Sequence, residues 1–178
     1  DIPHYTRMDY GNRVGFWRML EVLNKHKVRA CCCLNLELLD HFPEITRAMI
    51  AADWRYMAHG LYNSRPIYDL TEEQERAYWR DFITHVKEMT GKDLKGRLGG
   101  GAGYTARTDD LMAEAGCTYH TSWIIDDQPW PINVRGGQKF VYVPYTGQTN
   151  DAAMLAWNRE ADYFLQAIKD QFDVLYRA

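Results

Sequence analysis

The sequence predicts an α/β fold built around a parallel β-sheet. Segments with apolar residues at helical spacing alternate with short apolar runs along nearly the whole chain. Alternation on this scale is typical of strand–helix–strand crossovers, which make neighbouring strands parallel. The chain has 178 residues and no internal repeat or linker. Residues 1–178 are therefore expected to form one domain, long enough to bury a core without disulfide bonds or metal ions.

The first half of the chain is expected to contain three helices and two strands. Apolar residues recur at helical spacing from Val14 to Leu23, and Pro43 suits the first turn of a helix. The Thr71-Glu-Glu-Gln74 segment is a capping box, which marks a helix start. The expected elements are, in order, a helix over 12–26, a strand over 28–35, a helix from Pro43 on, a strand over 54–58 and a helix from Thr71 to Gly91.

The second half is expected to add two strands, a β-hairpin and two helices. The glycines from Gly99 on end the predicted strand 94–98, and Gly116 ends a helical pattern. Arg135-Gly136-Gly137 is a hairpin signal. The expected elements are a strand over 94–98, a helix from Thr105 or Thr108 to Gly116, a strand over 118–125, a hairpin whose second arm is 140–143, and a helix over 158–177.

Composition argues against several partners. The chain carries 21 Lys and Arg residues against 24 Asp and Glu residues, a formal net charge of −3, with 46% hydrophobic residues. A nucleic-acid binder would show a basic excess, and a disordered chain would be less hydrophobic. No apolar run approaches the ~20 residues that span a bilayer. We therefore expect a soluble chain with neither a nucleic acid nor a membrane as its partner.

Cysteine usage indicates a reducing compartment, and we expect a cytoplasmic location. Cys31, Cys32 and Cys33 are consecutive, so their side chains alternate across a strand and are poorly placed to chelate one metal or to pair. Buried small hydrophobic side chains in a core strand are the leading interpretation for them. A thiol-based redox site or a zinc site is the alternative.

Polar side chains follow the predicted strands, where ligands bind in parallel sheets. His59 ends the second strand, and its imidazole suits metal binding, proton transfer or donation to an oxyanion, although a structural role is equally plausible. Asn63 lies four residues later. Its amide suits a hydrogen bond to a substrate amide, orientation of His59, or simply a turn.

Acidic and aromatic residues gather in the same predicted loops. Asp126 and Asp127 follow the fourth strand and suit a turn, a solvated acidic edge, or a pair of catalytic carboxylates with divided roles. Their place on the same edge as His59 favours catalysis. The rings of Tyr62, Trp123 and Trp130 suit stacking on a sugar or a planar heterocycle, although a core position is the commoner role for any one of them.

Several short segments carry a family resemblance. They are Asp9-Tyr-Gly-Asn-Arg-Val-Gly15, His59-Gly-Leu-Tyr-Asn63, Leu94-Lys-Gly-Arg-Leu-Gly99, Leu111 to Gly116, Trp123-Ile-Ile-Asp-Asp-Gln-Pro129, Val143-Pro-Tyr145, Asn150-Asp151 and Asp170-Gln-Phe-Asp173. With these segments in this order, nearly the whole chain resembles the polysaccharide deacetylase superfamily (NodB homology domain, carbohydrate esterase family 4). The resemblance is to its allantoinase-like and peptidoglycan-deacetylase-like branch.

The resemblance implies a distorted (β/α) TIM-like barrel of the NodB type, incomplete in this chain. It implies hydrolysis of a carbon–nitrogen bond other than a peptide bond, in an amino sugar or a small cyclic amide. The family's early acidic motif would precede Asp1 and its late histidine would follow Ala178. Because the chain also lacks an initiator Met and ends on a helical pattern, we expect a piece of a longer protein.

The resemblance also implies roles for single residues. In metal-dependent members an Asp and two His hold a divalent ion, usually zinc. His59 matches the first His of that motif, but Asn63 stands at the second, so a full triad is not assembled here and a metal-independent site is the other expectation. Asp126 and Asp127 match the carboxylate pair of the branch. Asn150 matches a residue near the substrate.

Two other functions stay open. Asn63, together with Ser122 and Gln148 where relatives have acidic residues, is compatible with a catalytically impaired carbohydrate- or amide-binding protein of the same fold. A thiol-based redox domain would use the three consecutive cysteines. The expected partner in the leading hypothesis is a small amide or an amino sugar, and the resemblance implies a homo-oligomer.

Overall fold

The sheet has six strands in the computed structural model, which describes residues 6, 9–99 and 103–177. The strand order is β1-β2-β3-β4-β6-β5, and all neighbours are parallel except β5 and β6, which form an antiparallel hairpin. The predicted parallel sheet and hairpin are confirmed. The strands are β1 (Cys31–Asn35), β2 (Arg55–Gly60), β3 (Gly96–Arg97), β4 (Tyr119–His120), β5 (Trp130–Ile132) and β6 (Phe140–Tyr142).

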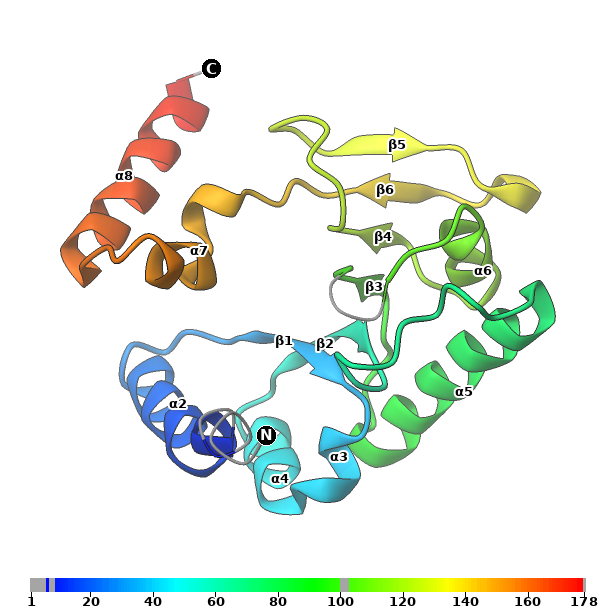
Figure 1. Cartoon of the computed structure of the whole chain (residues 1–178), viewed down its shortest axis with the longest axis horizontal. Coiled ribbons are helices and arrows are strands. Elements are labelled where there is room, and N and C mark those ends of the chain that lie inside the picture. Colours follow the sequence, from blue (N-terminus) through cyan, green and yellow to red (C-terminus); the bar gives the residue numbers. More distant parts are fainter. Residues whose placement is uncertain (1–5, 7–8, 100–102, 178) are drawn as a thin grey trace.

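Helices connect the strands, and the sheet is an open arc rather than a closed barrel (Figure 1). In that view α8 stands apart from α5 and α6. None of the helices in the described ranges combines the length and the apolar character needed to cross a bilayer. The helical segments are η1 (Gly11–Gly15), α2 (Phe16–Lys25), α3 (Leu38–His41), α4 (Pro43–Ala51), α5 (Glu72–Thr90), α6 (Thr108–Glu114), η2 (Arg135–Gly137), η3 (Gly147–Thr149), α7 (Asp151–Ala156) and α8 (Ala161–Arg177).

The parallel register sorts side chains onto two faces of the sheet. Leu34, Ala58, Arg97, His120 and Tyr142 are successive register partners, and all five are 0% exposed. Paired residues of neighbouring strands point to the same side. This face therefore packs into the main apolar core, which also contains buried residues of α4, α5 and α6. The other face carries half-buried and exposed residues.

Local sequence signals located the longest helix correctly. The Thr71 side chain accepts from the backbone of Gln74, and the Gln74 side chain accepts from the backbone of Thr71. Gly91 ends the helix with a φ of +70°, in the left-handed region that favours glycine. The predicted helices over 12–26 and from Pro43 are also confirmed.

Several predicted elements differ in extent. The predicted strand 28–35 begins at Cys31, the predicted strand 54–58 spans Arg55–Gly60, and the predicted strand 94–98 is only Gly96–Arg97. The predicted strand 118–125 contains only Tyr119–His120. Beyond it, the Ile125 N–H donates to the Tyr142 hydroxyl at 3.1 Å rather than to a strand backbone. The predicted helix 158–177 begins at Ala161, because Asn158 has a φ of +51°, which a right-handed helix excludes. A short helix, α7, precedes it and was not predicted.

The prediction of buried cysteines is wrong for the strand triplet. Cys31 and Cys33 are exposed and Cys32 is half-buried, whereas Cys117 is buried. Cys31 and Cys33 lie on the face of the sheet opposite the helices. In the described part of the chain, this face is not covered. Desolvation still raises the pKa of Cys32 to about 12 and that of Cys33 to about 11. A thiolate, the reactive form, is therefore disfavoured at neutral pH.

A buried carboxylate joins α5 to the segment that leads into α6. Glu75 is 0% exposed. Its oxygens accept hydrogen bonds from the hydroxyls of Thr108 at 2.7 Å and Thr105 at 2.8 Å, and from Arg107 Nε at 3.2 Å. Trp79 Nε1 lies 3.3 Å away on the same helix. A carboxylate that is buried away from water is stable only when donors such as these replace its hydration.

Replacing Glu75 is expected to destabilise the protein strongly. Glu75→Ala removes the shared acceptor and leaves buried hydroxyl and guanidinium donors unpaired, so the free energy of unfolding should fall by about 3 kcal/mol. Urea unfolding measures the change. Glu88→Ala, at an exposed site of the same helix, should stay within about 0.5 kcal/mol of the unaltered protein. Equal losses in the two variants would contradict the assignment.

Candidate active site

The candidate site begins where β2 ends. His59 is half-buried and follows Ala58, so its side chain lies on the opposite face of the sheet from the main core. Gly60 has a φ of +107°, where a side chain would be strained, and the chain leaves the sheet here. The Leu61 N–H then donates to the Tyr78 hydroxyl at 2.7 Å. This bond attaches the segment after β2 to α5.

Three side chains from two strand ends meet at this point. Asn63 Oδ1 lies 3.0 Å from His59 Nδ1 and 3.1 Å from Asn35 Nδ2. Asn35 Nδ2 also lies 3.5 Å from the carbonyl oxygen of Gly60. A register shift between Leu34 and Asn35 places Asn35 opposite Gly60 rather than opposite His59. The structure thus brings together the sequence-predicted His59 and Asn63, and adds Asn35.

The environment keeps the His59 imidazole neutral. Desolvation by burial lowers its pKa, and the positive charge of Arg97 lowers it further, while the hydrogen bond to Asn63 acts in the opposite direction. The net effect places the pKa below the ordinary value of 6.5. At neutral pH one ring nitrogen therefore carries a lone pair, as a base or a ligand requires.

The described residues do not fit a zinc site of three protein ligands. Zinc sites in proteins use three or four His, Cys, Asp or Glu ligands. Within residues 6, 9–99 and 103–177, no group of three or more such side chains is arranged to hold a metal ion. Asn63 Oδ1 already lies within hydrogen-bond distance of two nitrogens. Among these residues, His59 is the one metal ligand that the resemblance implied.

Tyr62 lies beside this cluster. Its hydroxyl is 3.2 Å from His41 Nε2, and the Arg65 guanidinium lies 4.9 Å from its ring centroid. Arg65 covers one face of the ring as a cation–π partner. A ligand that stacks on Tyr62 would therefore use the other face or displace Arg65, and the role of Tyr62 in substrate binding stays a prediction.

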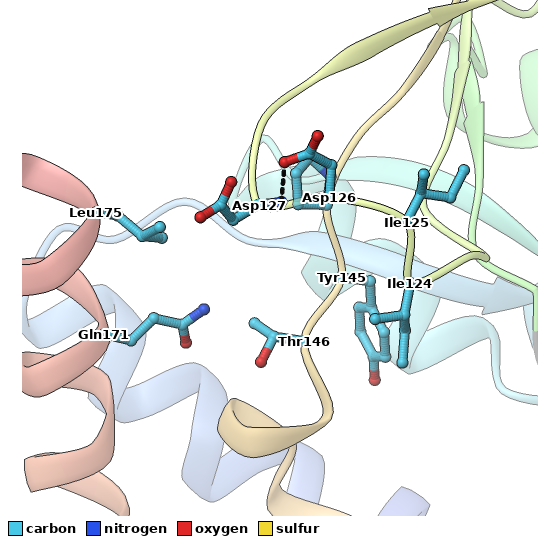
Figure 2. A pocket seen from close by; sticks show the side chains of 9 residues that line it. Ile124, Ile125, Asp126, Asp127, Tyr145, Thr146, Gln171 and Leu175 are labelled. Atoms are coloured by element: carbon cyan, nitrogen blue, oxygen red, sulfur yellow. Dashed lines mark hydrogen bonds between the residues drawn. The ribbon is translucent and has the colours of Figure 1, made fainter. Parts of the chain in front are cut away.

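Asp126 and Asp127 lie in a different pocket, shown in Figure 2. Asp126 Oδ1 accepts from the backbone N–H of Asp127 at 2.7 Å and of Gln128 at 3.4 Å. A side-chain hydrogen bond with Asp127 lowers the pKa of Asp126, and the two backbone bonds lower it further. The backbone bonds are those of an Asx turn. The pocket, of about 300 Å³, is lined by Ile124, Ile125, Asp126, Asp127, Pro144, Tyr145, Thr146, Gln171 and Leu175.

The two predicted groups of catalytic residues thus have different neighbours. His59 contacts Asn63, and the aspartates face Gln171 and Leu175 of α8 across the pocket (Figure 2). Asp126 has a structural function in its own turn. A catalytic function of either aspartate stays a prediction.

The two tryptophans differ in what surrounds them. Trp123 is half-buried, with its ring 4.6 Å from that of His120 and 5.3 Å from that of Tyr104, both edge-on. Trp130 is on the hairpin strand β5 and is 55% exposed. Trp123 is therefore held by aromatic packing, whereas Trp130 leaves most of its ring accessible.

Asn150 begins α7. Its Oδ1 accepts from the backbone N–H of Ala152 at 2.8 Å, which caps the helix, and its Nδ2 donates to the Tyr145 hydroxyl. Both ends of the amide are therefore in use within the protein. The predicted contact with substrate is untested, and the capping function explains the residue at this position.

Sequence reasoning missed a buried polar cluster on the helix-covered face. Arg97, 0% exposed, donates to the Ser122 hydroxyl at 3.2 Å and to the Gly103 carbonyl. Its guanidinium lies 5.3 Å from the Trp79 ring centroid and 5.2 Å from that of Tyr104. The segment 94–98, Leu-Lys-Gly-Arg-Leu, is predicted as a strand, and its charged residues were the signal in the sequence.

His120 and Asp109 complete this cluster. His120 is 0% exposed, and its Nδ1 lies 3.5 Å from Asp109 Oδ1. Neither ring nitrogen has a hydrogen-bond partner among the described residues. Burial lowers the pKa of His120 to about 4, with a further contribution from Arg97. Burial raises the pKa of Asp109 to about 6, although the Tyr104 hydroxyl donates to it.

Comparison with known proteins places the chain among deacetylases. The family model described as polysaccharide deacetylase matches residues 4–120. The peptidoglycan deacetylase of Helicobacter pylori is 24% identical over 142 residues, which are 80% of this chain and 48% of that protein. The chain spans about half the length of the curated relatives it matches.

Solved structures of similar fold include an allantoinase and a probable polysaccharide deacetylase. The crystal structure of Puue allantoinase has a TM-score of 0.85 and 28% identity. A probable polysaccharide deacetylase from Pseudomonas aeruginosa PAO1 has a TM-score of 0.82 and 29% identity. Each match covers 99% of this chain and 59% of the other chain. The described fold is thus close to part of the NodB-type barrel.

Substitutions at Asp126 test its function in the turn. Asp126→Asn keeps the oxygen that accepts the two backbone N–H groups, whereas Asp126→Ala removes it. We expect Asp126→Ala to unfold at lower urea concentration than the unaltered protein, and Asp126→Asn to unfold close to it. Asp127→Ala is the matched control. If the Asn and Ala variants lose equal stability, the carboxylate charge matters rather than the turn.

His120 is expected to make stability sensitive to acid. Its pKa is about 4 in the folded protein and about 6.5 in an unfolded chain. As the pH falls from 6.5 to 4, the unfolded state takes up a proton that the folded state does not, so the free energy of unfolding falls. The contribution of His120 is thus fully present above about pH 6.5.

The pH dependence of stability is tested by comparing the unaltered protein with His120→Gln. The stability of the unaltered protein relative to this variant should decrease as the pH is lowered through that window, because the variant has no imidazole to protonate. Asp109, whose raised pKa acts in the opposite direction, is present in both proteins. Urea unfolding at several pH values measures the difference. A difference independent of pH would exclude this explanation.

Proposed function

Because the chain belongs to the polysaccharide deacetylase family, we propose that it is part of a hydrolase that acts on carbon–nitrogen bonds other than peptide bonds. The substrate class is an N-acetylated amino sugar or a small cyclic amide. One observation supports this proposal above the others. His59 is held by Asn63 at the carboxyl end of β2, and its pKa is lowered, so it is neutral at pH 7.

A neutral imidazole in this position suits the chemistry of amide hydrolysis. His59 takes a proton from a water molecule as the water oxygen attacks the amide carbon. When the carbon–nitrogen bond breaks, the leaving nitrogen takes this proton from the His59 imidazolium, and the imidazole is neutral again. The products are a carboxylic acid and an amine, either as acetate and an amino sugar or as the two ends of an opened ring.

The similarity to Puue allantoinase and to the Pseudomonas aeruginosa protein supports the two substrate classes about equally, with TM-scores of 0.85 and 0.82. The aromatic residues that we propose for substrate binding are Tyr62, Trp123 and Trp130. Trp130 has the most accessible ring, at 55% exposed. A homo-oligomer is a further expectation that rests on the resemblance, and a cytoplasmic location is one that rests on cysteine usage.

Turnover of two substrate types tests the proposal. Acetate release from N-acetylglucosamine oligomers and ring opening of a cyclic ureide are measured with the protein and with His59→Ala. Loss of general base catalysis should lower turnover of the active substrate at least about 10²-fold. His26→Ala, at an exposed position just after α2, should leave it unchanged.

Two results would overturn the proposal. Unchanged turnover in His59→Ala would exclude the assigned base. Calorimetric binding of chitooligosaccharides without any hydrolysis would instead support the catalytically impaired binding protein.

A further inference from the structure

The neutral His59 ring has two possible tautomers, and they differ in chemistry. With the proton on Nδ1, the other nitrogen, Nε2, accepts a proton or binds as a ligand. With the proton on Nε2, that nitrogen donates a hydrogen bond instead, as an oxyanion would need. The hydrogen-bond partner of Nδ1 decides between these forms, because it is either an acceptor or a donor.

The partner of Nδ1 is Asn63, whose amide is held in turn by Asn35. The Asn63 amide has an oxygen that accepts and a nitrogen that donates, so the tautomer of His59 depends on which of the two faces the ring. Its atom between the two partners is 3.0 Å from His59 Nδ1 and 3.1 Å from the Asn35 amide. If the Asn35 nitrogen faces Asn63, the facing atom of Asn63 is its oxygen.

A backbone carbonyl orients Asn35. The Gly60 carbonyl oxygen is 3.5 Å from the Asn35 amide nitrogen and already accepts from the Leu36 N–H at 3.0 Å. A carbonyl oxygen accepts and never donates, so the opposite orientation would set the Asn35 oxygen against it. The register shift between Leu34 and Asn35 places Asn35 opposite Gly60. The chain of bonds thus starts from the backbone of the sheet.

We propose that Asn35 and Asn63 are positioning residues that hold His59 as the Nδ1–H tautomer, with the lone pair on Nε2. The sequence of contacts runs from the Gly60 carbonyl to Asn35 Nδ2, then Asn63 Oδ1, then His59 Nδ1. In this tautomer His59 accepts a proton rather than donating a hydrogen bond to an oxyanion. This catalytic role rests on the proposed hydrolase function. Asn63 thus orients the histidine instead of serving as a ligand.

The tautomer is measured without substrate by ¹⁵N NMR of histidine-labelled protein at about pH 8, where an imidazole of ordinary pKa is neutral. The chain has six histidines, and the His59 signals are those lost in His59→Gln. We expect the proton on Nδ1 and an unprotonated Nε2. A predominant Nε2–H form would overturn the proposal.

Three variants test the two asparagines. Asn63→Asp keeps an acceptor toward His59, so the Nδ1–H form should persist. Asn63→Leu removes the acceptor, and the preference should be lost. Asn35→Asp cannot donate, so Asn63 should turn its nitrogen toward the new carboxylate and toward Nδ1, and the Nε2–H form should increase. Unchanged signals from the buried His120 show that each variant is folded.

An unaltered tautomer in both Asn63→Leu and Asn35→Asp would overturn the proposal. Turnover distinguishes this inference from the proposed function. Where hydrolysis is present, Asn63→Asp should retain more turnover than Asn63→Leu. If the protein hydrolyses neither substrate and the tautomers still follow the variants, the proposed function fails and the positioning role stands.

Discussion

The pleat of a parallel sheet that is covered by helices on one face is the constraint on which this molecule depends. Successive residues of a strand point to opposite faces, so Ala58 packs in the core while His59, its neighbour, faces away from it. The same alternation buries Arg97 and His120 against α5 and α6. Core and candidate site are therefore separated by the thickness of the sheet, although their residues are adjacent in sequence.

Buried polar groups on the core face hold the connections that carry the site. Glu75 attaches α5 to the segment before α6 through Thr105, Arg107 and Thr108. Tyr78, one turn further along the same helix, accepts from the Leu61 N–H just after His59. The position of His59 thus depends on a helix whose own placement depends on a carboxylate without access to solvent. Arg97 adds a long-range contribution, since its charge lowers the pKa of the imidazole.

The site combines His59, which was predicted as catalytic, with two asparagines. Asn63 was predicted from the sequence, whereas Asn35 was not. His59 and Asn63 are four residues apart, so their contact was open to prediction from spacing. Asn35 is on another strand, and only the register shift between β1 and β2 brings it to Gly60. The aspartate pair shows the opposite case. Its motif was evident in the sequence, but Asp126 is occupied by its own turn, and the pocket beside it is completed by α8.

The sequence by itself determined what local interactions decide. The capping box at Thr71, the left-handed Gly91 and the Pro43 helix start depend on neighbours within a few residues, and so did the alternation that predicted a parallel sheet. Only the tertiary structure decided that Cys31 and Cys33 are exposed, that strand 118–125 stops at His120, and that Asn35 supports Asn63. Each of these depends on which strand is the neighbour and which face of the sheet is covered. Contacts between segments that are distant in the chain produce no periodic pattern in the sequence of either segment.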